Sequence, residues 1–209
     1  MVISLRGFSA CRIGQLLRQM VAQQSIDFDT VNQQAVMDTI RQSKKQMLAG
    51  SNGLKWEKTG VSAAAGLESI TSWLEDRTDI FRDPERASSQ HMDIPNAVLV
   101  SGIPGSGKSL MAKTAATILD MPLISMDMGA LLGGIMGESE HNMAAALRMA
   151  EQMAPCVLWI DEIEKAFSGS SQGSSSSDGG VGRRMFGKFL TWMQEKTSAC
   201  FVFATSNDI

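Results

Sequence analysis

Residues 102–109 (GIPGSGKS) constrain this chain more than any other stretch, because they match the pattern G-x-x-x-x-G-K-[ST] in full. They follow a short apolar run that reads as a strand and precede an alanine-rich segment that reads as a helix. Glycines let the backbone approach a phosphate chain closely, and the start of the helix directs the positive end of its dipole at the same point. A chance match is on the order of one percent. The sequence therefore predicts a phosphate-binding loop between a strand and a helix.

The apolar runs elsewhere predict the sheet to which this loop is attached. They are AVLVSG, PLISMD, CVLWID and CFVFAT, at residues 97–102, 122–127, 156–161 and 200–205. Segments with helical periodicity separate them. Strands without apolar–polar alternation are typical of parallel sheets buried on both faces. We expect an α/β fold, with a parallel sheet flanked by helices.

The first part of the chain has a different pattern. Residues 1–60 are expected to form a helical segment and linker, and residues 61–209 the α/β core. Apolar residues at helical spacing, among them Leu16 and Ile40, mark the two predicted N-terminal helices. A small basic group on the second helix, comprising Arg41, Lys44 and Lys45, is interpreted as a solvated face.

Composition excludes several classes of protein. A hydrophobic content of 44% excludes a wholly disordered chain, and a net charge of -3 offers no broad basic surface for nucleic acid. The three cysteines, Cys11, Cys156 and Cys200, are far apart in the sequence, so neither a zinc site nor a disulfide framework is indicated. No apolar run approaches the roughly twenty residues that span a bilayer, and no secretory signal is evident. We expect a soluble, cytoplasmic protein without a membrane partner.

Polar residues at the ends of two predicted strands complete a candidate site. Lys108 is suited to pair with the β- and γ-phosphates of a nucleotide, and the Ser109 hydroxyl to ligate Mg²⁺. Asp161, at the end of the third strand, would hold the same Mg²⁺, and Glu162 would orient and deprotonate the attacking water. Asn207, after the fourth strand, either hydrogen-bonds the γ-phosphate or the water, or simply belongs to a strand-end turn.

Three stretches resemble the Walker A, Walker B and sensor 1 motifs of AAA+ ATPases, in the same order and at similar spacing. They are residues 102–109 (GIPGSGKS), 156–162 (CVLWIDE) and 201–207 (FVFATSN). The sequence is most similar to the uncharacterised AAA proteins of cyanobacteria and plastids, which share phrases such as GGIMGESE, APCVLWIDEIEKAF and FLTWMQEKT. The resemblance implies a P-loop NTPase fold, ATP and Mg²⁺ as cofactors, and Gly66 beside the adenine. The ATP-binding residues that it implies in the loop are Gly102, Ile103, Pro104, Gly105, Ser106, Gly107, Lys108, Ser109 and Leu110.

The resemblance also implies an ATP-driven homo-oligomer, usually a ring, that remodels a macromolecular partner, which we expect to be a protein. The stretch similar to the first pore loop, residues 134–137, has no aromatic residue, and residues 168–182 are nearly all Ser and Gly, typical of a flexible loop. Arg183 and Arg184 are either intersubunit contacts or a solvated face. The arginine fingers, second sensor and lid of the resembling family would fall past Ile209, so we expect slow turnover by these residues alone.

Two alternatives to an ATP-driven remodelling enzyme follow from the same residues. A nucleotide-binding module that switches conformation without turnover would use the same loop. A small-molecule kinase of the P-loop class is disfavoured by the adjacent Asp161–Glu162 pair, by Asn207, and by the lack of an arginine-rich lid segment. Phosphate release with and without candidate acceptors separates these classes.

Overall fold

A computed structural model describes residues 10–22, 33–51, 53–60, 66, 68–82, 84–132, 138–164 and 178–207. Five strands of this part form one sheet in the order β1-β3-β4-β5-β2, with three parallel pairs and one antiparallel pair. The strands are β1 (Leu54–Glu57), β2 (Ala97–Ser101), β3 (Leu123–Met126), β4 (Cys156–Ile160) and β5 (Cys200–Ser206). The predicted α/β class with a helix-flanked sheet is confirmed.

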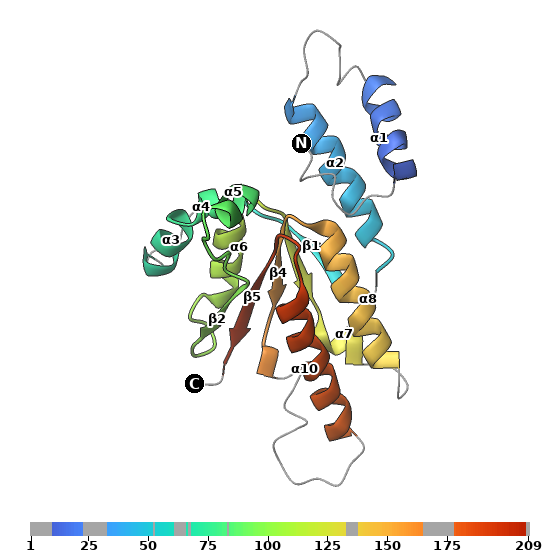
Figure 1. The fold of residues 1–209 in the computed structure, drawn as a ribbon. Coiled ribbons are helices and arrows are strands. Elements are labelled where there is room, and N and C mark those ends of the chain that lie inside the picture. Colours follow the sequence, from blue (N-terminus) through green and yellow to red (C-terminus); the bar gives the residue numbers. More distant parts are fainter. Residues whose placement is uncertain are drawn as a thin grey trace.

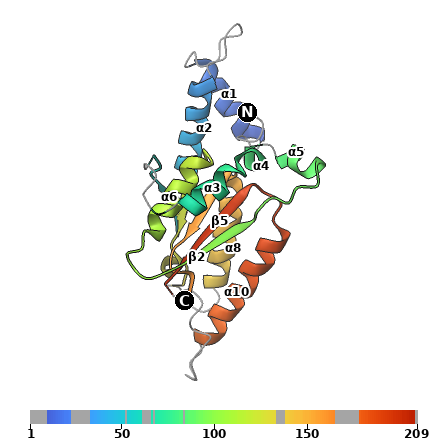
Figure 2. The same cartoon turned by 90° about the vertical axis from the view of Figure 1, so that its left-hand side faces the viewer.

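Helices cover both faces of this sheet (Figures 1 and 2). They are α1 (Ala10–Ala22), α2 (Gln33–Leu48), α3 (Glu68–Glu75), α4 (Thr78–Arg82), α5 (Pro84–Ser89), α6 (Lys108–Ile118), α7 (Met128–Leu132), α8 (Glu138–Met153) and α10 (Asp178–Glu195). In Figure 2, α6 lies on one side of the sheet and α10 on the other. The fold is therefore a three-layer arrangement with the parallel strands in the middle.

The core consists of two apolar clusters separated by the sheet. Leu123, Val157 and Phe201 point to one face and pack with residues of α3, α4 and α6. Ile124 and Leu158, one position further along their strands, point to the other face and pack with α8 and α10. Alternate residues of the same strands thus serve both clusters, which explains why the strands have no polar face.

Strand β1 was not anticipated from the sequence. It lies within residues 1–60 and pairs antiparallel with β3, so that Leu54 is opposite Met126 and Trp56 opposite Ile124. The Ser125 Oγ donates a hydrogen bond to Glu57 Oε1 across this pair, at 2.8 Å. Four residues with two charges carry too little periodicity to predict a strand, and the pairing partner lies about seventy residues away. The domain boundary at residue 61 stays a prediction.

The interpretation of the basic group on α2 as a solvated face is wrong for Lys44, which is only 4% exposed. Its ammonium group donates hydrogen bonds to the carbonyl oxygens of Met153, at 3.1 Å, and Ala154, at 2.6 Å. These carbonyls lie at the end of α8, where the helix dipole also favours a cation. Lys45, the next residue, is exposed.

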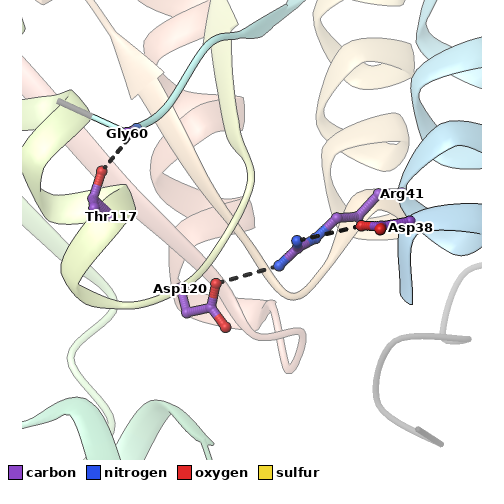
Figure 3. Close-up of polar contacts among 5 residues, drawn as sticks. All are labelled: Asp38, Arg41, Gly60, Thr117 and Asp120. Carbon is purple, nitrogen blue, oxygen red and sulfur yellow. Dashed lines mark hydrogen bonds and ion pairs between the residues drawn. The ribbon is translucent and has the colours of Figure 1, made fainter. Parts of the chain in front are cut away.

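A second basic residue of α2 makes a contact at the surface with the turn before β3 (Figure 3). The Arg41 guanidinium contacts Asp120 Oδ1 at 3.2 Å, in the turn between α6 and β3, and lies 4.0 Å from Asp38 on its own helix. Nearby, the Gly60 N–H donates to Thr117 Oγ1 on α6. Helix α2 is thus attached beyond the edge of the sheet at which the parallel strands begin (Figure 1).

Two predictions about loops have different outcomes. Residues 134–137, the stretch without an aromatic residue, and residues 168–177 of the Ser/Gly-rich stretch lie outside the described residues. Residues 178–182, the end of the stretch that we expected to be a flexible loop, instead form the start of α10. This helix buries Met185 and Phe189 in the apolar cluster that also contains residues of α8.

Candidate functional site

Three parallel strands bring the predicted site residues to one edge of the sheet. Strand β5 lies between β2 and β4, with Ser101 opposite Ser206 and Ile160 opposite Ala204. The Gly102 N–H donates to the Ser206 carbonyl at 3.1 Å, which ties the phosphate loop to the end of β5. The loop, Asn207 and the Asp161–Glu162 pair therefore follow neighbouring strands at their carboxyl ends, where open α/β sheets bind ligands.

The phosphate loop turns on two glycines in the left-handed region, Gly105 at φ 84° and Gly107 at φ 87°. Gly107 caps α6, so the N–H groups of the first turn face the loop. The ammonium group of Lys108 donates to the carbonyl oxygens of Gly102, at 2.6 Å, and Ile103, at 2.8 Å. Lys108 is only 7% exposed, and these two bonds satisfy a charge that burial would otherwise penalise.

The two carboxylates after β4 have different surroundings. Asp161 is exposed, and Glu162 is partly buried with its backbone at φ 49°, an uncommon conformation for a residue with a side chain. The Asn207 Nδ2 donates to Glu162 Oε1 at 2.8 Å, and the Asn207 backbone N–H donates to Glu164 Oε1 at 3.1 Å. The Asn207 amide, expected to face a phosphate or a water, here holds the neighbouring carboxylate.

Sequence reasoning missed one polar residue of this group, Thr205, which is fully buried. Its hydroxyl donates to Asp161 Oδ1 at 2.5 Å and accepts the Glu162 backbone N–H at 3.2 Å. Threonine is common in buried strands because it is β-branched, so nothing in the sequence distinguishes this one from a packing residue. The only sequence signal for Thr205 is its place near the end of the fourth predicted strand, level with the end of the strand that carries Asp161.

The residues suited to hold Mg²⁺ are Ser109 and Asp161, both of which are exposed. Hydroxyl and carboxylate oxygens are hard donors of the kind that Mg²⁺ prefers. No group of three or more His, Cys, Asp and Glu side chains that could hold a metal ion occurs within the described residues. A nucleotide-bound Mg²⁺ generally takes one or two protein ligands and otherwise phosphate and water oxygens.

A cavity of about 460 Å³ lies beside the carboxylates, on the side away from the phosphate loop. Asp161, Glu162 and Trp159 line it from β4, and Lys55 and Asp127 form an ion pair at 3.4 Å in its wall. A backbone hydrogen bond from Ala130 is the largest influence that lowers the pKa of Asp127. The Trp159 indole nitrogen is buried and has no hydrogen-bond partner in the part of the chain described above.

The remaining predicted residues lie on or next to helices α3 and α10. Gly66, at φ 89°, precedes α3, which packs against α6. Arg184 pairs with Glu140 of α8 at 2.7 Å, and Lys188 pairs with the same carboxylate, so their hydrogen bonds lower the pKa of Glu140. Arg183 is exposed. Among the helices with described residues, none is long and apolar enough to cross a membrane.

Comparison with known proteins shows the family to which this sequence is similar. The model of the ATPase family associated with various cellular activities (AAA) matches residues 98–209. The chain is 37% identical over 211 residues to the uncharacterised AAA domain-containing protein ycf46 of Guillardia theta, an alignment covering 100% of this chain and 40% of that protein. The ycf46 protein of Pyropia yezoensis is 36% identical over 209 residues, covering 99% and 40%.

A more distant relative is the ATP-dependent zinc metalloprotease FtsH 3 of Conexibacter woesei. It is 31% identical over 147 residues, which cover 68% of this chain and 20% of that protein. The chain thus spans about 40% of the length of the ycf46 relatives that it matches.

Proposed function

Because this chain belongs to the AAA family of ATPases, we propose that it binds ATP with Mg²⁺ at residues 102–110 and hydrolyses it. The observation that carries the proposal is the arrangement of the phosphate loop, Asn207 and the Asp161–Glu162 pair on three adjacent strand ends. A nucleotide bound at the loop would have its terminal phosphate directed toward these carboxylates. Gly66, which precedes the helix packed on α6, is assigned to the adenine end.

Each residue has a distinct role in this proposal. Lys108 exchanges its two carbonyl partners for phosphate oxygens, and the N–H groups of the first turn of α6 bind the same phosphates. Ser109 and Asp161 hold Mg²⁺, which neutralises phosphate charge when bound. Glu162 accepts a proton from the attacking water, and Asn207 keeps the Glu162 carboxylate oriented toward it.

Coupling of this turnover to a macromolecular partner is the second part of the proposal. The family context supports it, since its named members include an ATP-dependent protease and a peroxisomal ATPase. We expect a ring-shaped homo-oligomer acting on a protein in the cytoplasm. A nucleotide-binding switch without turnover is the alternative, and measurement of phosphate release distinguishes the two.

The binding part is tested by calorimetric titration of MgATP into the wild-type chain and into Lys108→Ala. Losing a hydrogen-bonded charge costs about 1.5–3 kcal/mol, so the variant should bind ATP about ten- to a hundred-fold more weakly. Lys113→Ala, on α6 but outside the loop, is the matched control and should bind as wild type does. Equal affinity of the Lys108 variant and the wild-type chain would refute the assignment.

A further inference from the structure

Thr205 occupies a place in the sheet from which one hydroxyl reaches both carboxylate residues. It is the next-to-last residue of β5, level with the end of β4, since Ala204 is opposite Ile160. A hydroxyl has one donor and two acceptor positions. Here the donor is directed at the Asp161 carboxylate and an acceptor at the Glu162 backbone N–H.

We propose that Thr205 is a positioning residue that fixes Asp161 for Mg²⁺ and Glu162 for proton transfer. This inference rests on the proposed ATP-binding function. Thr205 is 0% exposed and β-branched, so packing holds its hydroxyl in one orientation. The bond to Oδ1 then sets the direction of the Asp161 carboxylate, and we assign the other carboxylate oxygen to the cation.

The second bond of Thr205 acts on the backbone of Glu162. A positive φ at a residue with a side chain costs energy and persists only where the surroundings impose it. Thr205 holds the Glu162 N–H at 3.2 Å, and Asn207, two residues further along the chain, holds its carboxylate at 2.8 Å. The end of β5 thus grips Glu162 at both its backbone and its side chain.

The test measures nucleotide binding with and without Mg²⁺. Loss of a threonine with a purely structural role would weaken both kinds of binding alike, whereas loss of a positioning residue should weaken only the Mg²⁺-dependent part. ATP affinity is measured with Mg²⁺ and with a chelator, for the wild-type chain, Thr205→Val and Thr205→Ser. Removing a group that orients a metal ligand typically lowers metal affinity by about ten- to a hundred-fold. We expect Thr205→Val to lose about ten-fold or more of the Mg²⁺-dependent gain while binding without Mg²⁺ is unchanged, and Thr205→Ser to retain the gain.

A second readout needs no nucleotide. Amide hydrogen exchange at Glu162, followed by NMR, should be faster in Thr205→Val than in wild type and normal in Thr205→Ser, because only the serine still accepts the N–H. If Thr205→Val does not fold, Thr205→Ser and Thr205→Ala form a matched pair, since both lack the methyl group and differ only in the hydroxyl. The same difference in Mg²⁺ response is expected between them.

The outcomes distinguish this inference from the function on which it rests. A wild-type chain that binds no ATP would overturn the proposed function and the role of Thr205 together. A wild-type chain that binds MgATP, with a Thr205→Val variant of identical Mg²⁺ response and identical Glu162 exchange, would overturn the role of Thr205 alone.

Discussion

Glu162 is held at both ends before any substrate arrives. Its backbone N–H is bonded to Thr205 and its carboxylate to Asn207, so the proposed base has little freedom to leave its place. Preorganisation of this kind is what general-base catalysis requires, because the proton acceptor must lie within hydrogen-bond reach of the water.

Glu162→Gln should therefore separate binding from hydrolysis. The amide keeps the shape and still interacts with Asn207 but cannot accept a proton, so ATP affinity should stay near that of wild type. Hydrolysis should fall by about 10² to 10⁴, the usual contribution of a general base. Single-turnover phosphate release with protein in excess measures this even where turnover is slow. Wild-type rates in the variant would show that another group accepts the proton.

The two buried cysteines offer a prediction that does not depend on the function. Cys156 and Cys200 are opposite each other on β4 and β5, with their sulfur atoms 3.7 Å apart. The hydrogen bond to Cys200, together with burial, raises the pKa of the Cys156 thiol well above its usual range. The thiolate is the reactive form, and both side chains are buried, so Cys156 and Cys200 should resist a thiol reagent in the folded chain and react fully in guanidinium. A Cys11→Ser background removes the third thiol. Rapid modification of the folded protein would contradict the prediction.

At the residue scale, the sequence predicts the groups that chemistry requires but not the groups that hold them. Lys108, Asp161 and Glu162 stand out because their residue types and spacing follow from phosphate and water chemistry. Thr205 does not, because its contacts join residues more than forty positions apart. Lys44 was misread for the same reason, since only the folded chain shows that its partners are the carbonyls at the end of α8.

At the scale of elements, helix α2 is joined to α8 through one buried charge. Burial lowers the pKa of Lys44 from 10.5 to about 8, although the nearby Cys156 opposes the shift. Below pH 8 both the folded and the unfolded chain carry this proton. Between about pH 8 and 10.5 the unfolded chain binds more protons than the folded one, so this residue makes the free energy of unfolding rise with pH there.

Lys44→Met should abolish this rise. Between pH 7.5 and pH 9.5, urea unfolding of the wild-type chain should gain about 1–2 kcal/mol relative to the variant, given about 1.36 kcal/mol per pKa unit. The substitution also removes the two hydrogen bonds of Lys44 and so lowers stability at both pH values. Comparing each protein with itself at two pH values cancels that constant loss. Lys45→Met, at the exposed neighbouring position, should behave as wild type. If the free energy of unfolding of Lys44→Met rose with pH as much as that of wild type, the lowered pKa of Lys44 would be contradicted.

The elements themselves were predictable to different extents. Strands β2 to β5 follow from apolar runs because burial on both faces leaves no room for polar residues. Strand β1 escapes prediction because it is an edge strand of four residues with one buried position, Leu54. The helical start of α10 was missed because its local composition favours a loop, while the packing of Met185 and Phe189 further along favours a helix.

At the scale of the whole molecule, one sheet separates two clusters but also joins them. Neighbouring residues of β4 and β5 belong to opposite clusters, so neither cluster can loosen without disturbing strands that the other needs. We therefore expect the described core to unfold in a single transition.

Leu158→Ala and Phe201→Ala test this, since the two residues are almost fully buried and lie in different clusters. Each should lower the free energy of unfolding by about 2–5 kcal/mol. Circular dichroism and tryptophan fluorescence should report the same midpoint for each variant. Leu99→Ala, at a position 63% exposed, is the control and should change stability by less than about 0.5 kcal/mol. Separate midpoints for the two probes would show that the clusters unfold independently.

Helix α8 has a mechanical consequence that follows from its two ends. It begins at the edge of the sheet that carries the phosphate loop and ends at the carbonyls that Lys44 holds. At 1.5 Å per residue, its length is about 24 Å. A hydrogen-bonded helix is stiff along its axis, so it behaves as a rod, fastened to α10 through Glu140 at one end and to α2 at the other. If α8 moved about 1 Å away from Lys44 while α2 stayed in place, the 3.1 Å bond from Lys44 to Met153 would lengthen beyond hydrogen-bond range. Movement of α8 at the edge of the sheet that carries the phosphate loop would therefore change the contacts that hold α2 at the opposite edge.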